Sequence, residues 1–351
     1  MSQERIEVGI NDLPKLVTLN PHISKLIIGW PGDGKTSVLK TLEEKYGEEY
    51  YYIYLDAPSL ETQDIGMTMP NAETKSLEYW INETTFKIRQ AKAEGKKLCI
   101  MIDEGLKASR MVKLAMTKIL LEQEIGNEKL PEGSPVFMTS NDPRMGIGDS
   151  MEQHLGNRVC IYYLRKVSTD EYIKYKADRG LDPALGAFLE RNDDCLADTT
   201  EPSHKDNAMS MNFNQPPRQA VTPRSLCKVN DVIKQRHKYG DLLQATIAGL
   251  CGRQFAERMS AFVNVADKVH TFKDVMDDPK GVSVAENPTI LVIQTTTLAL
   301  AVKTEEEFKK CYDYVERVDK VTEEVGQIFK IRMMKDKKQL FMSDGRAKSW
   351  L

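Results

Sequence analysis

Nine consecutive residues at positions 29–37, Gly-Trp-Pro-Gly-Asp-Gly-Lys-Thr-Ser, constrain the fold of this chain more than any other stretch. Positions 29–36 fit the phosphate-loop pattern G-x-x-x-x-G-K-[ST], in which backbone N–H groups surround a polyphosphate at the positive end of a helix dipole. A short apolar run at 25–28 predicts a buried strand before the loop, and helical periodicity at 37–45 predicts a helix after it. The order of strand, glycine-rich turn and helix favours a nucleotide site over a chance match.

The residue types in the loop predict how a nucleotide is held. Lys35 is expected to reach the β- and γ-phosphates and Thr36 to place its hydroxyl on Mg²⁺, so ATP and Mg²⁺ are the predicted cofactors. The residues expected to contact the nucleotide are Gly29, Pro31, Gly32, Asp33, Gly34, Lys35, Thr36 and Ser37.

A second strong pattern is the apolar run at 98–102, which is followed directly by Asp103 and Glu104. A continuous apolar run predicts a strand buried on both faces, as in a parallel sheet covered by helices. The two carboxylates then emerge at the carboxyl end of the strand, where open α/β sheets bind ligands. We expect Asp103 to hold the Mg²⁺ and Glu104 to orient and deprotonate the attacking water.

Three further polar residues are candidates for contact with the γ-phosphate. Asn141 ends an apolar strand at 135–141 and is expected to bind the lytic water and the phosphate, with ordinary capping as its alternative role. Arg158 precedes a strand at 160–164 and is expected to reach the γ-phosphate of a neighbouring subunit, against a surface salt bridge. Arg224 opens a helix and is expected to couple phosphate loss to domain rotation, against a plain surface arginine. The predicted catalytic set is Glu104, Lys35, Asn141, Arg158 and Arg224.

Composition narrows the class of protein further. The formal net charge is −3 with acidic and basic residues interspersed, which argues against DNA as the main partner. No run approaches the roughly 20 apolar residues of a membrane span, and the start of the chain is polar. The six cysteines lie far apart without a C-x-x-C pair, so neither zinc nor a disulfide framework is expected. A cytoplasmic location fits these features.

The pattern of elements predicts three regions. Residues 1–165 are expected to form an α/β nucleotide-binding domain with a five-stranded parallel sheet. Residues 166–275 are expected to form a helical lid that contains a flexible loop at about 193–220, and residues 276–351 a helical C-terminal region with a mobile charged tail from Lys335. The turn-rich segment 61–82 is either a loop at the central pore of a ring or a surface connection.

These motifs occur in the order and rough spacing of an AAA+ ATPase, which the chain resembles over about residues 20–265. The loop at 29–36 resembles Walker A, Asp103-Glu104 Walker B, Asn141 sensor 1, Arg158 the arginine finger and Arg224 sensor 2. The chain looks more narrowly like the MoxR branch, in the form often encoded by bacteriophages. That narrower resemblance is carried by Gln63–Gly66 with Pro70, by residues 121–133 and 140–143, by 181–183 with Phe188-Leu189, by 222–225, and by 248–252 with Ala256 and Phe262.

The resemblance implies an ATP hydrolase that works as a hexameric ring and remodels a protein substrate. It also implies a partner with a von Willebrand factor A domain, which nothing in the chain's own chemistry indicates. One rival hypothesis is a DNA-directed motor or loader, although no basic stripe or aromatic stacking platform is present. Another is a scaffold that binds nucleotide without hydrolysing it, which the intact Asp103-Glu104 pair disfavours.

Overall fold

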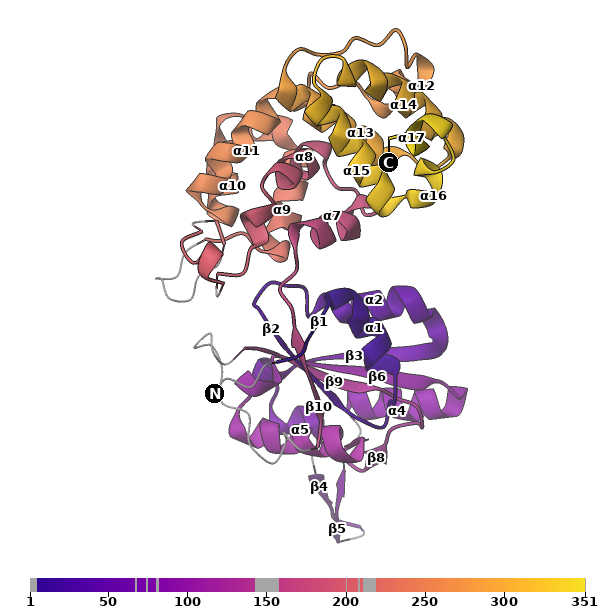
Figure 1. The fold of residues 1–351 in the computed structure, drawn as a ribbon. Coiled ribbons are helices and arrows are strands. Elements are labelled where there is room, and N and C mark those ends of the chain that lie inside the picture. Colours follow the sequence, from indigo (N-terminus) through magenta and orange to yellow (C-terminus); the bar gives the residue numbers. More distant parts are fainter. Residues whose placement is uncertain are drawn as a thin grey trace. The chain divides into compact units, whose positions relative to one another are not determined.

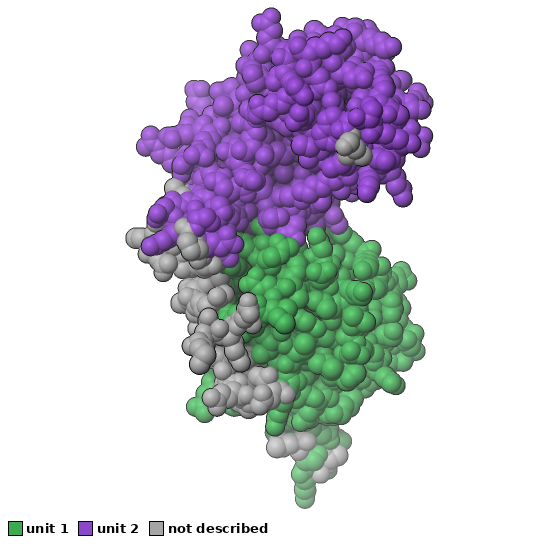
Figure 2. Space-filling model, in the orientation of Figure 1, with its two compact units in different colours: residues 1–167 green, residues 168–351 purple. Residues whose placement is uncertain are grey.

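The computed structural model describes residues 5–66, 68–73, 75–79, 82–142, 158–199, 201–207, 209–210 and 219–350. Its contacts divide the chain into two compact units, residues 1–167 and 168–351 (Figure 2). Each unit has its own buried apolar residues and is described separately below. The further division of the second part into a lid and a C-terminal region stays a prediction.

The first unit is built on a parallel six-stranded sheet (Figure 1). The strand order is β1-β10-β2-β9-β6-β3, and every neighbouring pair is parallel. The sheet class predicted from the apolar runs is confirmed, with the two-residue β1 as an added edge strand. The strands are β1 (Glu7–Val8), β2 (Lys25–Gly29), β3 (Tyr50–Asp56), β6 (Lys97–Asp103), β9 (Val136–Asn141) and β10 (Cys160–Leu164).

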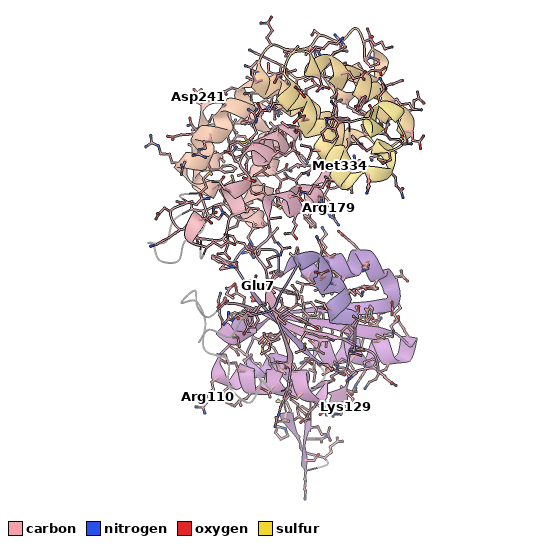
Figure 3. All side chains as sticks on the ribbon, in the orientation of Figure 1. Glu7, Arg110, Lys129, Arg179, Asp241 and Met334 are labelled. Carbon is pink, nitrogen blue, oxygen red and sulfur yellow. The ribbon has the colours of Figure 1, made fainter. Side chains whose placement is uncertain are left out.

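Helices cover both faces of this sheet, which explains why its central strands read as unbroken apolar runs. One face packs against α1 (Leu13–Thr18) and α2 (Ser37–Tyr46). The other packs against α4 (Glu83–Glu94) and α5 (Arg110–Glu122). Successive residues of a strand alternate between the two clusters: Ile27 and Phe137 belong to the first, Leu26 and Val136 to the second. Figure 3 shows the side chains on these elements, with Glu7 on β1 and Arg110 at the start of α5.

The segment expected to be a turn-rich connection contains a β-hairpin. The strands β4 (Thr68–Asn71) and β5 (Ser76–Tyr79) pair antiparallel, and Figure 1 shows them extending away from the sheet. Its base lies against a second hairpin, β7 (Glu124–Ile125) and β8 (Glu128–Lys129), whose turn is Gly126-Asn127, a dipeptide that predicts such a turn. A Cβ on Gly66 would lie 3.2 Å from the Cα of Gly126, so the two hairpins approach through glycine backbone. Whether β4–β5 contacts a substrate protein stays a prediction.

The described residues of the second unit form helices joined by loops, with an isolated β-bridge between Ser210 and Val221. Capping side chains begin several helices where the sequence predicts them: Ser168, Thr222 and Thr304 each accept a hydrogen bond from the N–H three residues on. The helices are α7 (Thr169–Ala177), α8 (Pro183–Arg191), α9 (Pro223–Lys234), α10 (Leu243–Cys251), α11 (Arg253–Ala266), α12 (Phe272–Asp277), α13 (Pro288–Ala301), α14 (Glu305–Asp319), α15 (Glu323–Asp336), α16 (Lys338–Phe341) and α17 (Gly345–Lys348).

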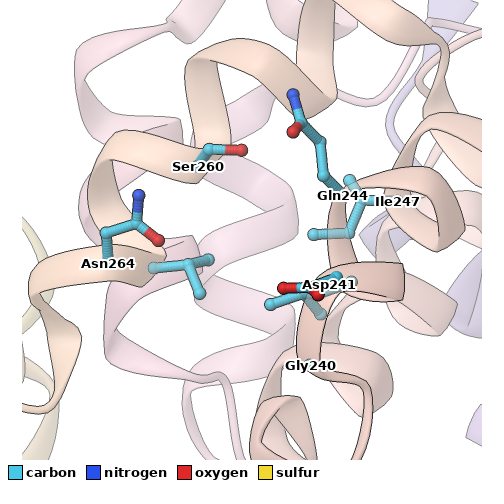
Figure 4. Close-up of a pocket in the computed structure, with 8 residues that line it drawn as sticks. Gly240, Asp241, Gln244, Ile247, Ser260 and Asn264 are labelled. Carbon is cyan, nitrogen blue, oxygen red and sulfur yellow. The ribbon is translucent and has the colours of Figure 1, made fainter.

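The apolar pattern predicts a helix from Asp241 to about Val265 and another from Thr304 to about Met334, and each stretch forms two helices in the structure. Gly252 separates α10 from α11 at a φ of +89°, a conformation that glycine adopts without strain. The helices on its two sides frame a shallow hollow whose lining includes Asp241, Gln244, Ser260 and Asn264 (Figure 4). The helix expected to run on from Thr304 ends at Asp319, and α15 begins only at Glu323. Of the helices described here, none combines the length and the apolar character needed to cross a bilayer.

The predicted flexible loop at 193–220 has packed parts. A 3-10 helix forms at Asp193–Leu196, and the side chains of Cys195 and Leu196 are buried. Met209 and Ser210 are buried as well, and the Ser210 hydroxyl donates to the Cys195 carbonyl over 3.0 Å. Residues 200, 208 and 211–218 of this segment lie outside the described residues. Segment 193–220 is mostly polar in sequence, so its composition does not indicate that a few of its apolar residues are buried.

The prediction of a mobile C-terminal tail is wrong. After α15 the chain forms α16 and α17, and Phe341 is completely buried. Its ring centroid lies 6.0 Å from those of Phe308 and Trp350. Many charged residues surround these aromatic residues in the sequence, so the apolar contacts of the tail are not evident from composition.

We therefore predict that Phe341→Ala lowers the free energy of unfolding of the helical unit by about 3–5 kcal/mol, because the substitution removes buried apolar contacts and leaves a cavity among the aromatic rings. The matched control is Ile331→Ala on α15, where the side chain is 48% exposed and a much smaller loss is expected. Urea unfolding followed by circular dichroism measures both. Equal midpoints for the Phe341 variant and the wild type would contradict the packed tail.

Candidate functional site

The glycine-rich loop joins β2 to α2 and owes its shape to its glycines. Gly32 and Gly34 have φ angles of +82° and +88°, in the left-handed region that side chains disfavour. A Cβ on Gly34 would also lie 3.0 Å from Cδ1 of Ile10. At the end of β2, a Cβ on Gly29 would meet the Cβ of Leu164 at 2.8 Å. Backbone conformation therefore favours glycine at position 32, space favours it at position 29, and both favour it at position 34.

Lys35 is held inside the loop. Its side chain is buried, and Nζ donates to the carbonyl oxygens of Gly29 over 2.8 Å and Trp30 over 2.6 Å. It also donates to Oδ1 of Asn141 over 3.0 Å. This contact arises because Asn141, the last residue of β9, pairs in register with Gly29 on the neighbouring strand. The sheet thus brings the lysine and the amide predicted for one site into direct contact.

Asp103 lies at the end of β6 and accepts four hydrogen bonds. Its Oδ2 accepts from the hydroxyl of Thr36 over 2.8 Å and from the hydroxyl of Tyr54 over 3.1 Å. Its Oδ1 accepts from the hydroxyl of Thr139 and from the backbone N–H of Glu104, the latter over 3.2 Å. The carboxylate is buried, so these donors replace the water that would otherwise stabilise its charge. Thr36 and Asp103, the two predicted metal ligands, are in contact.

Tyr54 and Thr139 are site residues that sequence reasoning missed. Burial, together with the neighbouring Asp103 carboxylate, raises the pKa of Tyr54 to about 12, so its hydroxyl is protonated and donates at neutral pH. No local sequence signal indicates this contact, which follows from the structure: Tyr54 stands two residues before Asp56, and Asp56 pairs with Asp103 in the parallel register of β3 and β6. That register is not visible in the sequence.

Glu104 lies in a tight turn after β6. Its backbone has a φ of +53°, which is uncommon for a residue with a side chain. The next residue must be small, because a Cβ on Gly105 would lie 2.1 Å from the sulfur of Met138. The Glu104 side chain is 38% exposed, and its Oε2 accepts a hydrogen bond from Nζ of Lys107 over 2.5 Å. The carboxylate therefore lies beside the site but is engaged by a lysine.

Arg158 is not brought to the loop of its own chain. It is exposed and precedes β10, whose first residue, Cys160, pairs with Lys25 at the start of β2. The loop begins at the other end of β2, at Gly29, so the length of β2, roughly 13 Å of strand, separates the two levels of the sheet, and Arg158 lies two residues before the nearer level. Residues 143–157, which precede Arg158, lie outside the described residues.

Arg224 belongs to the second unit. It lies in the first turn of α9, where the side chain of Thr222 accepts from the N–H of Ser225, and it is exposed. Its predicted role toward a phosphate in the first unit stays a prediction.

The residues of the cluster fit the chemistry of a magnesium nucleotide. Lys35 offers an ammonium group, and the loop leads into the N-terminus of α2, where N–H groups favour an anion. The hydroxyl of Thr36 and the carboxylate of Asp103 are hard oxygen ligands of the kind that Mg²⁺ prefers. Mg²⁺ commonly combines one or two such ligands with phosphate oxygens and water, so this small ligand set is sufficient.

Comparison with known proteins gave no match to a family model and none to a curated protein. Solved structures with some similarity include an ATPase candidate from Cytophaga hutchinsonii, with 14% identity over 73% of this chain and 90% of that one, at a TM-score of 0.34. The P216G mutant of RuvB from Thermotoga maritima has 13% identity over 80% and 81%, at 0.36. PCH-2 from C. elegans has 15% identity over 74% and 66%, at 0.32. These scores are low, so the assignment of the site rests on its own residues.

The hydroxyl of Thr139 offers a direct test of the Asp103 cluster. We predict that Thr139→Val lowers the free energy of unfolding by about 1.5–3 kcal/mol, the usual range for a hydrogen bond to a charged group. The matched control is Ser140→Ala on the same strand, because the buried Ser140 hydroxyl has no hydrogen-bond partner among the described residues. Urea unfolding should show a clear loss for the first variant and almost none for the second. Equal losses would contradict a special role for the Thr139 hydroxyl.

Proposed function

We propose that this protein binds Mg-ATP at the loop of residues 29–36 and hydrolyses it to ADP and phosphate. The observation that carries the proposal is the convergence of Lys35, Thr36, Asp103 and Asn141 at the carboxyl ends of β2, β6 and β9. An ammonium, a hydroxyl, a carboxylate and an amide are the groups that phosphoryl transfer to water requires. A scaffold that only bound Mg-ATP would need Asp103 for the cation but would not need Glu104, the predicted base, beside it.

Different residues of the chain would bind the phosphates, hold the cation and accept the proton of the attacking water. Lys35 would exchange its contacts with loop carbonyls for phosphate oxygens, and Asn141, which now accepts from Lys35, would bind the γ-phosphate and the attacking water. Thr36 and Asp103 would hold Mg²⁺, whose charge offsets that of the phosphates. Glu104 acts as the general base once its carboxylate leaves Lys107.

The proposed assembly is a ring of identical chains, of the AAA+ class and its MoxR branch. Arg158 supports an assembly, because it lies at the opposite edge of the sheet from the loop and is too far away to serve its own nucleotide. In a ring it would approach the γ-phosphate of an adjacent copy and offset the charge of the transition state. Arg224, which belongs to the helical unit, would couple loss of the γ-phosphate to rotation of that unit. A hexamer, a protein client and a von Willebrand factor A partner are part of the proposal through the resemblance alone.

Glu104→Gln tests the base. We predict that this variant binds ATP as well as the wild type and hydrolyses it about 10²–10⁴-fold more slowly, because an amide cannot accept the proton of water. Glu94→Gln is the control and should turn over normally, because Glu94 ends α4 and accepts from the hydroxyl of Tyr51 at the amino end of β3, away from the site. Binding of a fluorescent ATP analogue and release of phosphate are measured separately. Turnover by Glu104→Gln at the wild-type rate would rule out Glu104 as the base.

Mixing two inactive variants tests whether the arginine acts between subunits. Lys35→Ala keeps Arg158 but cannot bind ATP, whereas Arg158→Ala keeps an intact loop without its arginine. We predict that each variant alone is inactive and that an equimolar mixture regains part of the wild-type phosphate release, because some interfaces then combine an intact loop with an intact Arg158. A mixture of either variant with buffer is the control. No recovery at concentrations where the wild type is assembled and active would count against action in trans.

A further inference from the structure

We propose that Tyr54 is a positioning residue of the magnesium site: its hydroxyl fixes the Asp103 carboxylate in the orientation that the cation requires. The inference rests on the proposed function and adds a residue to it. The Tyr54 hydroxyl donates a hydrogen bond to Oδ2 of Asp103 over 3.1 Å.

The contact follows from the register of two neighbouring strands. Tyr54 on β3 pairs with Met101 on β6, so Asp103 is two residues further along the adjacent strand. Residues two apart lie on the same face of a sheet, and this is the face covered by α2. A tyrosine at position 54 is long enough to extend toward the carboxyl edge of the sheet and meet the carboxylate there.

The oxygen that Tyr54 contacts is the one that faces the loop. Oδ2 of Asp103 accepts from Tyr54 and also from Thr36, the second expected metal ligand. If Thr36 turned its hydroxyl oxygen toward a cation, Oδ2 would lose part of this support, whereas the Tyr54 contact, which comes from the neighbouring strand β3, would remain. Residues that orient a metal ligand in this way commonly change metal affinity by a factor of 10–100 when they are removed.

Burial does not explain the position of the Tyr54 hydroxyl. The residue is 48% exposed on the edge strand of the sheet, so its ring has little apolar packing to fix it. Within the described part of the chain, Asp103 is its one hydrogen-bond partner. The Tyr54 hydroxyl is nevertheless directed at a buried carboxylate, and this contact indicates a role at that carboxylate.

Tyr52 offers a matched control on the same strand and the same face. Its hydroxyl donates to the carbonyl of Leu42 in α2 over 3.1 Å and makes no contact with Asp103. Tyr52→Phe and Tyr54→Phe therefore each remove one hydroxyl from β3. Only the second removes a donor from the expected metal ligand, so the pair separates an effect on the cation from a general effect on stability.

The test measures binding of a fluorescent ATP analogue to the full chain during titration with MgCl₂, and again in EDTA. For Tyr54→Phe we expect the half-saturating Mg²⁺ concentration to rise about tenfold or more. Binding in EDTA should remain within a factor of two of the wild type, since the loop is untouched. Tyr52→Phe should match the wild type in both titrations, and the urea midpoints of both variants should be similar.

Three results would overturn the inference. If the wild type responds to Mg²⁺ and Tyr54→Phe responds at the same concentration, Tyr54 does not position the site, while the proposed function stands. If Tyr54→Phe loses EDTA binding and stability to the same degree as Mg²⁺ response, its role is only structural. If the wild type binds no nucleotide with or without Mg²⁺, the proposed function fails, and the role of Tyr54 fails with it.

Discussion

The buried carboxylate of Asp103 is the group on which the arrangement of the candidate site depends. A buried charge without partners is costly, and here the partners come from separate elements: Thr36 from the loop, Tyr54 from β3 and Thr139 from β9. Each donor stabilises the carboxylate and is itself held by it. The strand order therefore has a chemical consequence, because it places β3 and β9 on the two sides of β6.

Lys35 and Asn141 form a second polar contact at the same edge of the sheet. The ammonium group is satisfied by two loop carbonyls and the Asn141 side chain, so the loop is stabilised by the residue that would bind phosphate. A nucleotide must compete with these contacts, and it can do so because phosphate oxygens carry full charge. Arg158 lies toward the other edge of the sheet. On the proposed function, each chain carries a phosphate site at the carboxyl ends of its strands and an arginine near their amino ends. Such a chain can complete the site of a neighbouring copy, which favours assembly into a ring.

Sequence reasoning located the parts of the site that belong to local patterns. The loop, the strand that ends at Asp103 and the strand that ends at Asn141 were each identified from a few consecutive residues. Tyr54 was missed because its neighbours in sequence give no reason to expect a contact with Asp103, 49 residues away. The C-terminal tail was misjudged for a related reason, since Phe341 is buried by residues on other helices.

The sequence by itself determined the order of strand, loop and helix, the glycines of the loop and the capping of helices such as α9. These features depend on backbone conformation and on burial that repeats every few residues, so short stretches are sufficient to specify them. Only the tertiary structure decided the register between β3 and β6, the contact of Tyr54 with Asp103 and the burial of Phe341. Such contacts join residues far apart along the chain, and a shift of one residue in strand pairing would turn the side chain to the other face of the sheet.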